Sequence, residues 1–152
     1  MRVWRLAKQA YTLDLTGQGN RRTGARWNSP GRPVVYTSAV LSLAVLETLV
    51  HTRPGLLPKD LAAVEIHIPD HLSVREIPLG DFPSGWETGQ RNDWFRQTGD
   101  AWLITAVDPC LKAPSVIVPE ESNVMLNSLH PAISQVQIVA VRPFRLDPRL
   151  VK

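Results

Sequence analysis

A glutamate inside an apolar segment is the first residue whose placement suggests chemistry. Glu47 lies in the run A-V-L-S-L-A-V-L-E-T-L-V-H that begins at Ala39. A helix over this run puts Leu43 and Ala44 on the turn before it and Val50 and His51 on the turn after it. Because burying an unpaired carboxylate is costly, Glu47 either reaches water from the edge of the apolar stripe or points into a site that needs a carboxylate.

A stretch rich in arginine and glycine precedes this helix. Residues 16–32 read T-G-Q-G-N-R-R-T-G-A-R-W-N-S-P-G-R, a composition typical of a loop. Its glycines let the backbone approach a ligand closely, and arginine binds phosphate through a planar fork of donors. The stretch is therefore either a solvated turn or an anion-binding loop, without the glycine patterns of dinucleotide folds or P-loops. Its arginines are Arg21, Arg22, Arg26 and Arg32.

Other kinds of site find less support. Neither Ser115 nor Cys110 lies in a G-x-S-x-G motif or has an evident acid–base partner. The histidines show no spacing typical of metal ligands, so we expect no metal site. They are His51, His67, His71 and His130. Tyr36 could lie beside Glu47, or it could be a core tyrosine whose hydroxyl is satisfied.

The elements that position these residues follow from the hydrophobic patterns. Ser38 is predicted to cap a helix from Ala39, and Gly99-Asp100 to separate two short helices over 90–97 and 101–107. In the second helix, Trp102 and Ile104 are predicted to be core residues. Strands are predicted at 3–7, 34–37, 63–69, 72–77, 113–118, 122–126 and 135–146, with Pro143 marking an edge or bulge. Loops are expected at 16–32 and 80–89, and a break at 53–55. This order is typical of an α+β fold with a mixed sheet.

Length and composition set further bounds. The 152 residues, of which 43% are hydrophobic and 20% charged, predict one globular domain over residues 1–152. A single cysteine excludes a disulfide framework and fits a reducing cytoplasm. No signal peptide or membrane-spanning run is predicted. The net charge of +3 is too small to indicate nucleic-acid binding by itself.

A set of ordered motifs resembles the RES domain family, the toxins of bacterial toxin–antitoxin pairs. T-G-A-R-W-N-S-P-G-R-P-V-V-Y-T-S begins at Thr23, and L-A-V-L-E-T-L-V-H follows it. Further on come G-D-A-W, A-P-S, N-V-M-L-N-S-L-H-P and D-P-R-L, which begin at residues 99, 113, 123 and 147. The Arg, Glu and Ser that name the family correspond to Arg26, Glu47 and Ser115. Small departures stand at Ala25, Ala113 and Ser128.

The resemblance implies a compact α+β fold with a mixed, mostly antiparallel sheet, similar to ADP-ribosyltransferases. It also implies cleavage of NAD+, as a substrate and not a cofactor, at the nicotinamide–ribose bond. Glu47 would stabilise the oxocarbenium-like charge, Arg26 would hold the pyrophosphate or a ribose, and Tyr36 would stack on nicotinamide. Ser115 and Asn123 would contact the dinucleotide. The leaving group is already cationic, so no general acid is needed, in keeping with the lack of a second convergent carboxylate or histidine.

The same resemblance implies a partner, a small antitoxin with an Xre-like helix-turn-helix, and leaves a homodimer within that complex open. Neither direct nucleic-acid binding nor membrane association is expected. The acceptor remains undecided between water and phosphate. One alternative is mono-ADP-ribosyl transfer onto a cellular protein. A second is a non-enzymatic basic module that binds nucleic acid, although aromatic residues are not interleaved with a Lys/Arg stripe.

Overall fold

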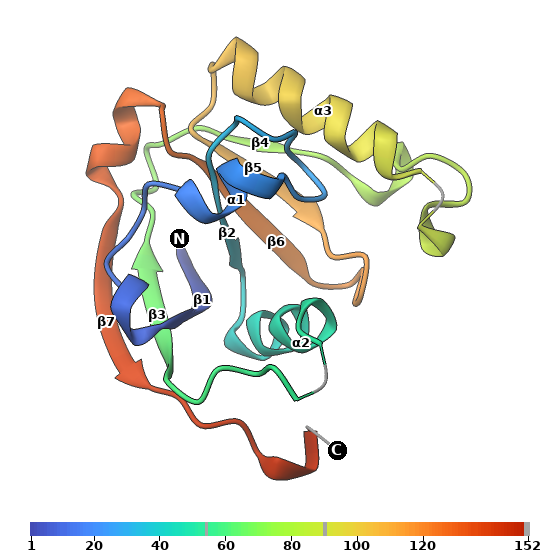
Figure 1. Cartoon of the computed structure of the whole chain (residues 1–152). Coiled ribbons are helices and arrows are strands. Elements are labelled where there is room, and N and C mark those ends of the chain that lie inside the picture. The colour runs from blue at the N-terminus through green and yellow to red at the C-terminus, as the bar shows by residue number, and fades with distance from the viewer. Residues whose placement is uncertain (54, 90, 151–152) are drawn as a thin grey trace.

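A mixed sheet forms the framework of the computed structural model, which describes residues 1–53, 55–89 and 91–150. The strand order is β4-β5-β6-β2-β1-β3-β7 (Figure 1). The strands are β1 Arg2–Lys8, β2 Val34–Ser38, β3 Leu61–His67, β4 Val74–Glu76, β5 Cys110–Pro114, β6 Ser122–Asn127 and β7 Gln137–Pro143. The helices are α1 Gln18–Thr23, α2 Leu41–His51 and α3 Asn92–Thr105. Single 3₁₀ turns cover Gln9–Tyr11, Leu79–Asp81, Trp86–Thr88, Pro131–Gln135 and Pro148–Leu150.

The sheet divides between β1 and β2. These two strands share the single antiparallel pair Trp4↔Ser38, whereas β1 pairs with β3 over its whole length. Only β4 and β5 pair in parallel among the described strands, so the expected mixed, mostly antiparallel sheet is confirmed. Pro143 lies on the edge strand β7, where a residue without an N–H is tolerated.

Alternate residues of the central strands supply two cores. On β2, Val35 joins one core and Val34 the other, as the period-two geometry of a strand requires. The first core packs β1, β2, β3, β5 and β6 together through Val3, Val35, Val64, Ile66, Ile68, Cys110, Val124, Leu126 and Val136. The second lies beneath α3 and consists of Trp27, Val34, Ile77, Phe82, Phe95, Trp102, Leu111, Ala113 and Met125. Figure 1 shows α3 along one face of β5 and β6, and α2 at the end of β2.

The pair Gly99-Asp100 does not separate two helices. One helix, α3, runs through it, which corrects the predicted short helices at 90–97 and 101–107; Gln90 lies outside the described residues. Gly99 permits close packing, since a Cβ there would lie 1.9 Å from the carbonyl oxygen of Trp27. The Asp100 carboxylate accepts hydrogen bonds from the backbone N–H and the hydroxyl of Ser29. Local propensity places Gly99-Asp100 at a helix end, whereas these tertiary contacts explain why the pair lies inside α3.

Several other boundaries differ from prediction. Helix α1 forms within the expected loop over 16–32. Ser38 ends β2 and does not cap α2, which begins at Leu41. Strand β5 ends at Pro114, earlier than the predicted strand over 113–118. Ile104 is 64% exposed and not a core residue, while Trp102 is fully buried as predicted.

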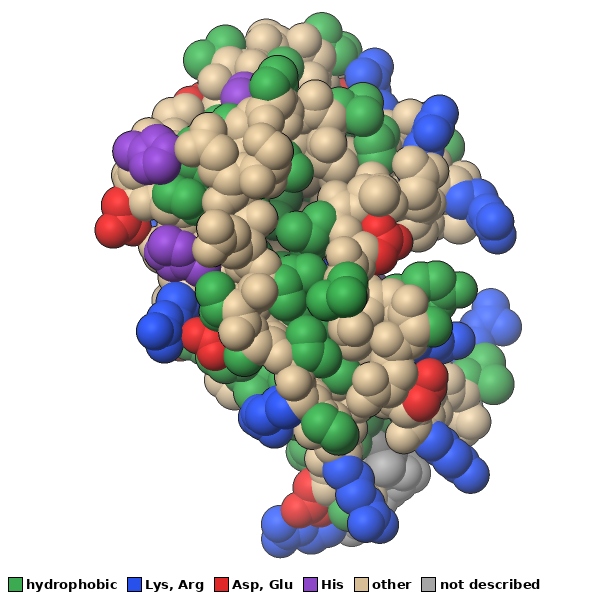
Figure 2. Space-filling model, turned by 90° about the vertical axis from the view of Figure 1, so that its left-hand side faces the viewer, with side chains coloured by type: hydrophobic (Ala, Val, Ile, Leu, Met, Phe, Trp, Pro, Cys, Tyr) green, Lys and Arg blue, Asp and Glu red, His purple; other side chains and the backbone are tan. Residues whose placement is uncertain are grey.

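The described surface is mixed in charge. Figure 2 shows Lys and Arg side chains on one face, separated by acidic, polar and apolar surface and not gathered into a continuous stripe. No helix among the described residues is long and apolar enough to cross a membrane.

Replacing Gly99 by alanine tests the packing of α3 against Trp27. Because the new methyl group would meet backbone, which cannot rotate away, we expect the free energy of unfolding to fall by about 1–3 kcal/mol or more. Gly19→Ala is the matched control, since Gly19 is also helical and a Cβ there meets nothing within 4 Å. Helix propensity predicts a small stabilisation for the control, up to about 1 kcal/mol. Urea unfolding measures both, and equal stabilities would contradict the packing argument.

Candidate functional site

The site is built where α2 meets one end of the sheet. Antiparallel pairing of β2 with β6 places Ser38 opposite Asn123, and pairing of β5 with β6 places Ala113 opposite the same asparagine. Ser115 follows β5 directly, and its backbone N–H donates to the carbonyl of Glu121 at 2.8 Å. The strand register therefore brings Ser38, Asn123 and Ser115 to one end of the sheet, and Glu47 reaches them from α2.

One oxygen of the Glu47 carboxylate is held firmly. Oε1 accepts a hydrogen bond from Ser115 Oγ at 2.9 Å and another from Asn123 Nδ2 at 2.5 Å. Ser115 is fully buried, and its Oγ also accepts from the backbone N–H of Ile117 at 3.0 Å. The Asn123 Oδ1 atom accepts from Ser38 Oγ at 2.8 Å. Glu47 therefore points into a polar network and not simply to water.

The other oxygen faces a histidine. Oε2 of Glu47 lies 3.4 Å from Nε2 of His51, one helical turn further along α2. The Glu47 side chain is 21% exposed and that of His51 is 70% exposed, so this oxygen lies toward solvent. The expectation that no histidine converges on Glu47 is therefore wrong. The i, i+4 spacing had placed His51 on the helical turn after Glu47, but not as a partner of its carboxylate.

The hydrogen bonds keep Glu47 ionised. Burial by itself raises the pKa of the Glu47 carboxyl, but the hydrogen bonds from His51, Asn123 and Ser115 outweigh burial and leave the pKa below its usual value. Glu47 is thus a partly buried anion at neutral pH, fixed through one oxygen.

Arg26 comes from the turn between α1 and β2, which Ala25 and Asn28 close as an isolated antiparallel bridge. Its Nη1 donates to Asn92 Oδ1 at 2.8 Å, and its guanidinium carbon lies 5.2 Å from the centre of the Phe95 ring. Burial lowers the pKa of Arg26, against which the charges of Glu47 and Tyr36 act. The guanidinium stays charged, since even lowered values in proteins lie far above neutral pH.

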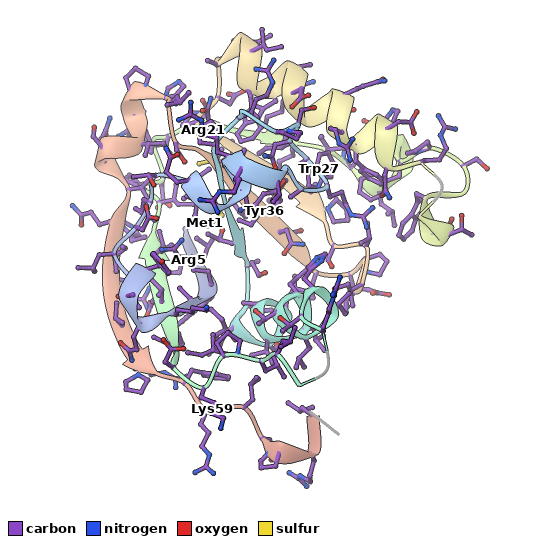
Figure 3. All side chains as sticks on the ribbon, in the orientation of Figure 1. Met1, Arg5, Arg21, Trp27, Tyr36 and Lys59 are labelled. Carbon is purple, nitrogen blue, oxygen red and sulfur yellow. The ribbon has the colours of Figure 1, made fainter. Side chains whose placement is uncertain are left out.

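Tyr36 supports this arginine turn through its hydroxyl. The hydroxyl accepts from the backbone N–H of Trp27 at 3.0 Å and donates its proton to Asn28 Oδ1 at 2.7 Å. Figure 3 shows the labelled Tyr36 and Trp27 close together in the middle of the molecule. Burial is the main reason that the pKa of Tyr36 is raised, so it remains a neutral phenol. Its ring packs against the second core.

The structure joins the predicted residues in two groups. Glu47, Ser115 and Asn123 form one hydrogen-bonded set, while Arg26 and Tyr36 belong to the arginine turn. The negative charge of Glu47 raises the pKa of Arg26, against the lowering caused by burial. Sequence reasoning missed the supporting residues Asn28, Ser38, Asn92 and Asp100, whose roles depend on partners distant in the sequence. Within the described ranges, no group of three or more His, Cys, Asp or Glu residues could hold a metal ion.

Comparison with known proteins shows the family of the chain. The RES domain family matches residues 2–147, and the chain belongs to this family. The "Prs ADP-ribosylating toxin" of Sphingobium sp. is 37% identical over 98% of this chain and 96% of its own length. The "Toxin Res" of Photorhabdus laumondii is 34% identical over 100% of this chain and 98% of its own.

A solved structure shows the same fold. A chain in the crystal structure of the M. tuberculosis MbcT-MbcA toxin-antitoxin complex aligns with a TM-score of 0.77 and 18% sequence identity. The alignment covers 99% of this chain and 86% of that chain. The expected α+β fold, a single compact domain with a mixed and mostly antiparallel sheet, is confirmed.

Removing one hydrogen bond to Glu47 should raise its pKa. In Asn123→Ala, burial continues to favour the neutral acid while one opposing interaction is lost. In the unaltered chain the pKa is below the usual 4.5, so ionised Glu47 stabilises the fold above about pH 4.5. That stabilisation disappears as the pH falls through the folded-state pKa. Carbon-13 NMR titration of the Glu47 carboxyl group measures both proteins.

Asn20→Ala is the control, because the Asn20 amide donates to the carbonyl of Val34 and does not contact Glu47. The control should leave the pKa of Glu47 unchanged. An equal Glu47 pKa in Asn123→Ala and the unaltered protein would show that this hydrogen bond does not hold the carboxylate ionised.

Proposed function

We propose that this protein is the toxin of a bacterial toxin–antitoxin pair and that it degrades NAD+ by cleaving the nicotinamide–ribose bond. The observation that carries the proposal is the Glu47 carboxylate, which is ionised and fixed by hydrogen bonds from Ser115 and Asn123. Membership of the RES domain family and the names of the Photorhabdus and Yersinia relatives, both "Toxin Res", support the toxin role.

Cleavage of the nicotinamide–ribose bond needs an anion that stabilises positive charge more than it needs a general acid. When the bond breaks, nicotinamide leaves as a neutral molecule with the bonding electron pair, and positive charge develops on the ribose. A preorganised carboxylate stabilises that charge without reorganising during the reaction. Attack by water then yields ADP-ribose and a proton, whereas attack by phosphate yields ADP-ribose-1″-phosphate. Glu47 Oε2 faces outward beside His51 and is the oxygen placed to contact the ribose or the acceptor.

The remaining residues divide between binding and support. Arg26 binds the pyrophosphate, and the Tyr36 ring stacks on nicotinamide. Ser115 and Asn123 were expected to contact the dinucleotide, but their hydrogen bonds favour holding Glu47 as their main role. Ser115 in particular has no exposed surface. The mixed charge of the face in Figure 2 gives no support to a nucleic-acid-binding module.

A second candidate is transfer of ADP-ribose onto a protein. The Sphingobium relative, at 37% identity over nearly the whole chain, is named an ADP-ribosylating toxin. The same site would serve, since only the nucleophile that captures the ribose differs.

The proposed partner is an antitoxin with an Xre-like helix-turn-helix, and the proposed place of action is the cytoplasm, where NAD+ is available. The structural neighbour was solved in a toxin-antitoxin complex. Such a partner would block NAD+ entry, with an acidic group near Arg26 in the place of a phosphate.

Incubation of the purified protein with NAD+ and phosphate, followed by product analysis, tests the proposal. Free ADP-ribose indicates hydrolysis, and ADP-ribose-1″-phosphate indicates phosphorolysis. Labelling of proteins in added lysate, without either free product, would favour the transferase. Absence of any NAD+ turnover by folded protein would contradict both enzymatic functions.

Glu47→Gln should lower kcat by about 10²–10³-fold, the loss seen when one preorganised electrostatic group is removed. The amide oxygen can still accept from Ser115 and Asn123, so the variant should fold, with a melting temperature lowered only by the loss of the stabilisation that the carboxylate charge contributes. Glu87→Gln is the control, because Glu87 is exposed and lies outside the site. Steady-state NAD+ consumption by both variants measures the effect. Full activity in folded Glu47→Gln would remove Glu47 from the mechanism.

A further inference from the structure

The charge of Arg26 is oriented by two neutral groups. Its Nη1 atom donates to the amide oxygen of Asn92 at 2.8 Å, and its guanidinium lies over the Phe95 ring at 5.2 Å. Both partners come from the first turn of α3. Arg26 and Asn92 are 66 positions apart in the sequence. The residues around Arg26 therefore do not predict this hydrogen bond.

The choice of an amide over a carboxylate has a physical consequence. A carboxylate in the same place would make a stronger, charge-assisted bond to the guanidinium. It would also neutralise the cation and repel an approaching phosphate. An amide oxygen fixes the direction of the guanidinium and leaves its net charge available, and an aromatic face does the same through its quadrupole.

The position of Asn92 relative to Arg26 is fixed by contacts further along α3. Gly99 packs on the backbone of Trp27, the residue after Arg26. Asp100 accepts two hydrogen bonds from Ser29 and lies 3.4 Å from Arg32 Nε. These contacts fix the position of α3 relative to the turn that carries Arg26. The side chain of Asn92 is therefore positioned to accept a hydrogen bond from Arg26. The Asn92 side chain is not used as a helix cap, which leaves it free for Arg26.

We propose that Asn92 is a positioning residue that aims the Arg26 guanidinium and preserves its charge for a ligand carrying a pyrophosphate. This inference rests on the proposed function, in which Arg26 binds the anionic centre of the dinucleotide. It goes beyond that function by assigning substrate selection to a residue on α3, outside the ordered motifs of the family. It also defines the class of ligand, since a nucleoside without phosphates would gain nothing from the preserved charge.

Asn92→Asp separates positioning from a merely structural role. Aspartate keeps an oxygen in place to accept from Arg26, and it is favourable in the first turn of a helix. We therefore expect an unchanged or higher melting temperature together with a KM for NAD+ raised at least about tenfold, because an anion now competes at the phosphate site. The effect on kcat should be smaller than the effect on KM. A purely structural asparagine would show no change in KM.

Asn92→Ala removes the acceptor without adding charge. Loss of one neutral hydrogen bond predicts a KM increase of about two- to tenfold, smaller than for the aspartate. Gln97→Glu makes the same change in net charge at an exposed position on the same helix and should leave KM unaltered. Calorimetric binding of ADP-ribose to each variant provides a second readout that does not require turnover.

Arg26→Lys distinguishes failure of this inference from failure of the proposed function. Lysine cannot reproduce a bidentate contact, so KM should rise. If Arg26→Lys raises KM but Asn92→Asp matches the unaltered protein in KM and ADP-ribose affinity, the role of Asn92 is overturned and that of Arg26 stands. If Arg26→Lys also leaves both quantities unaltered, the anion-binding role of Arg26 itself is overturned.

Discussion

A partly buried carboxylate must be hydrogen-bonded, and the architecture of this protein depends on meeting that constraint for Glu47. An unpaired buried anion would protonate or destabilise the fold. Here Ser115 and Asn123 satisfy one oxygen, and Ser38 in turn orients Asn123. Ser38 lies on β2, Asn123 lies on β6 and Ser115 directly follows β5, so their meeting depends on the register of these three strands. A slip of one residue in β6 would turn Asn123 away from the site.

The second constraint concerns the arginine turn, which has little regular structure of its own. Two elements hold the turn in place. From β2, the Tyr36 hydroxyl makes hydrogen bonds to Trp27 and Asn28. From α3, Gly99 packs against the backbone of Trp27, and Asp100 accepts a hydrogen bond from Ser29. This arrangement gives the G-D-A-W motif a physical meaning. Glycine allows the helix to approach the backbone of Trp27, aspartate binds Ser29, and Trp102 fills the second core.

Together these two constraints fix two opposite charges. Glu47 is fixed through its Oε1 atom, and Arg26 is fixed through Asn92 and Phe95, which carry no charge. Both devices are forms of preorganisation, in which the protein bears the cost of orienting polar groups before a ligand arrives. Ser115 and Asn123 donate to Glu47, whereas Asn92 in the first turn of α3 accepts from Arg26.

The sequence by itself determined the α+β class, the strands β2, β3 and β6 and the helix that carries Glu47, and it singled out Glu47 as a carboxylate on an apolar helix face. Arg26 was selected among four arginines only through the family resemblance. Hydrophobic periodicity and residue chemistry are local, so they can be recognised without the fold. Only the tertiary structure decided that Ser38 binds Asn123 instead of capping α2, that Gly99-Asp100 lies within a helix, and that Asn92 meets Arg26. Each of these residues could serve locally, as a helix cap or at a helix end. Its actual partner lies far away in the sequence, and only strand register and helix packing bring the two together.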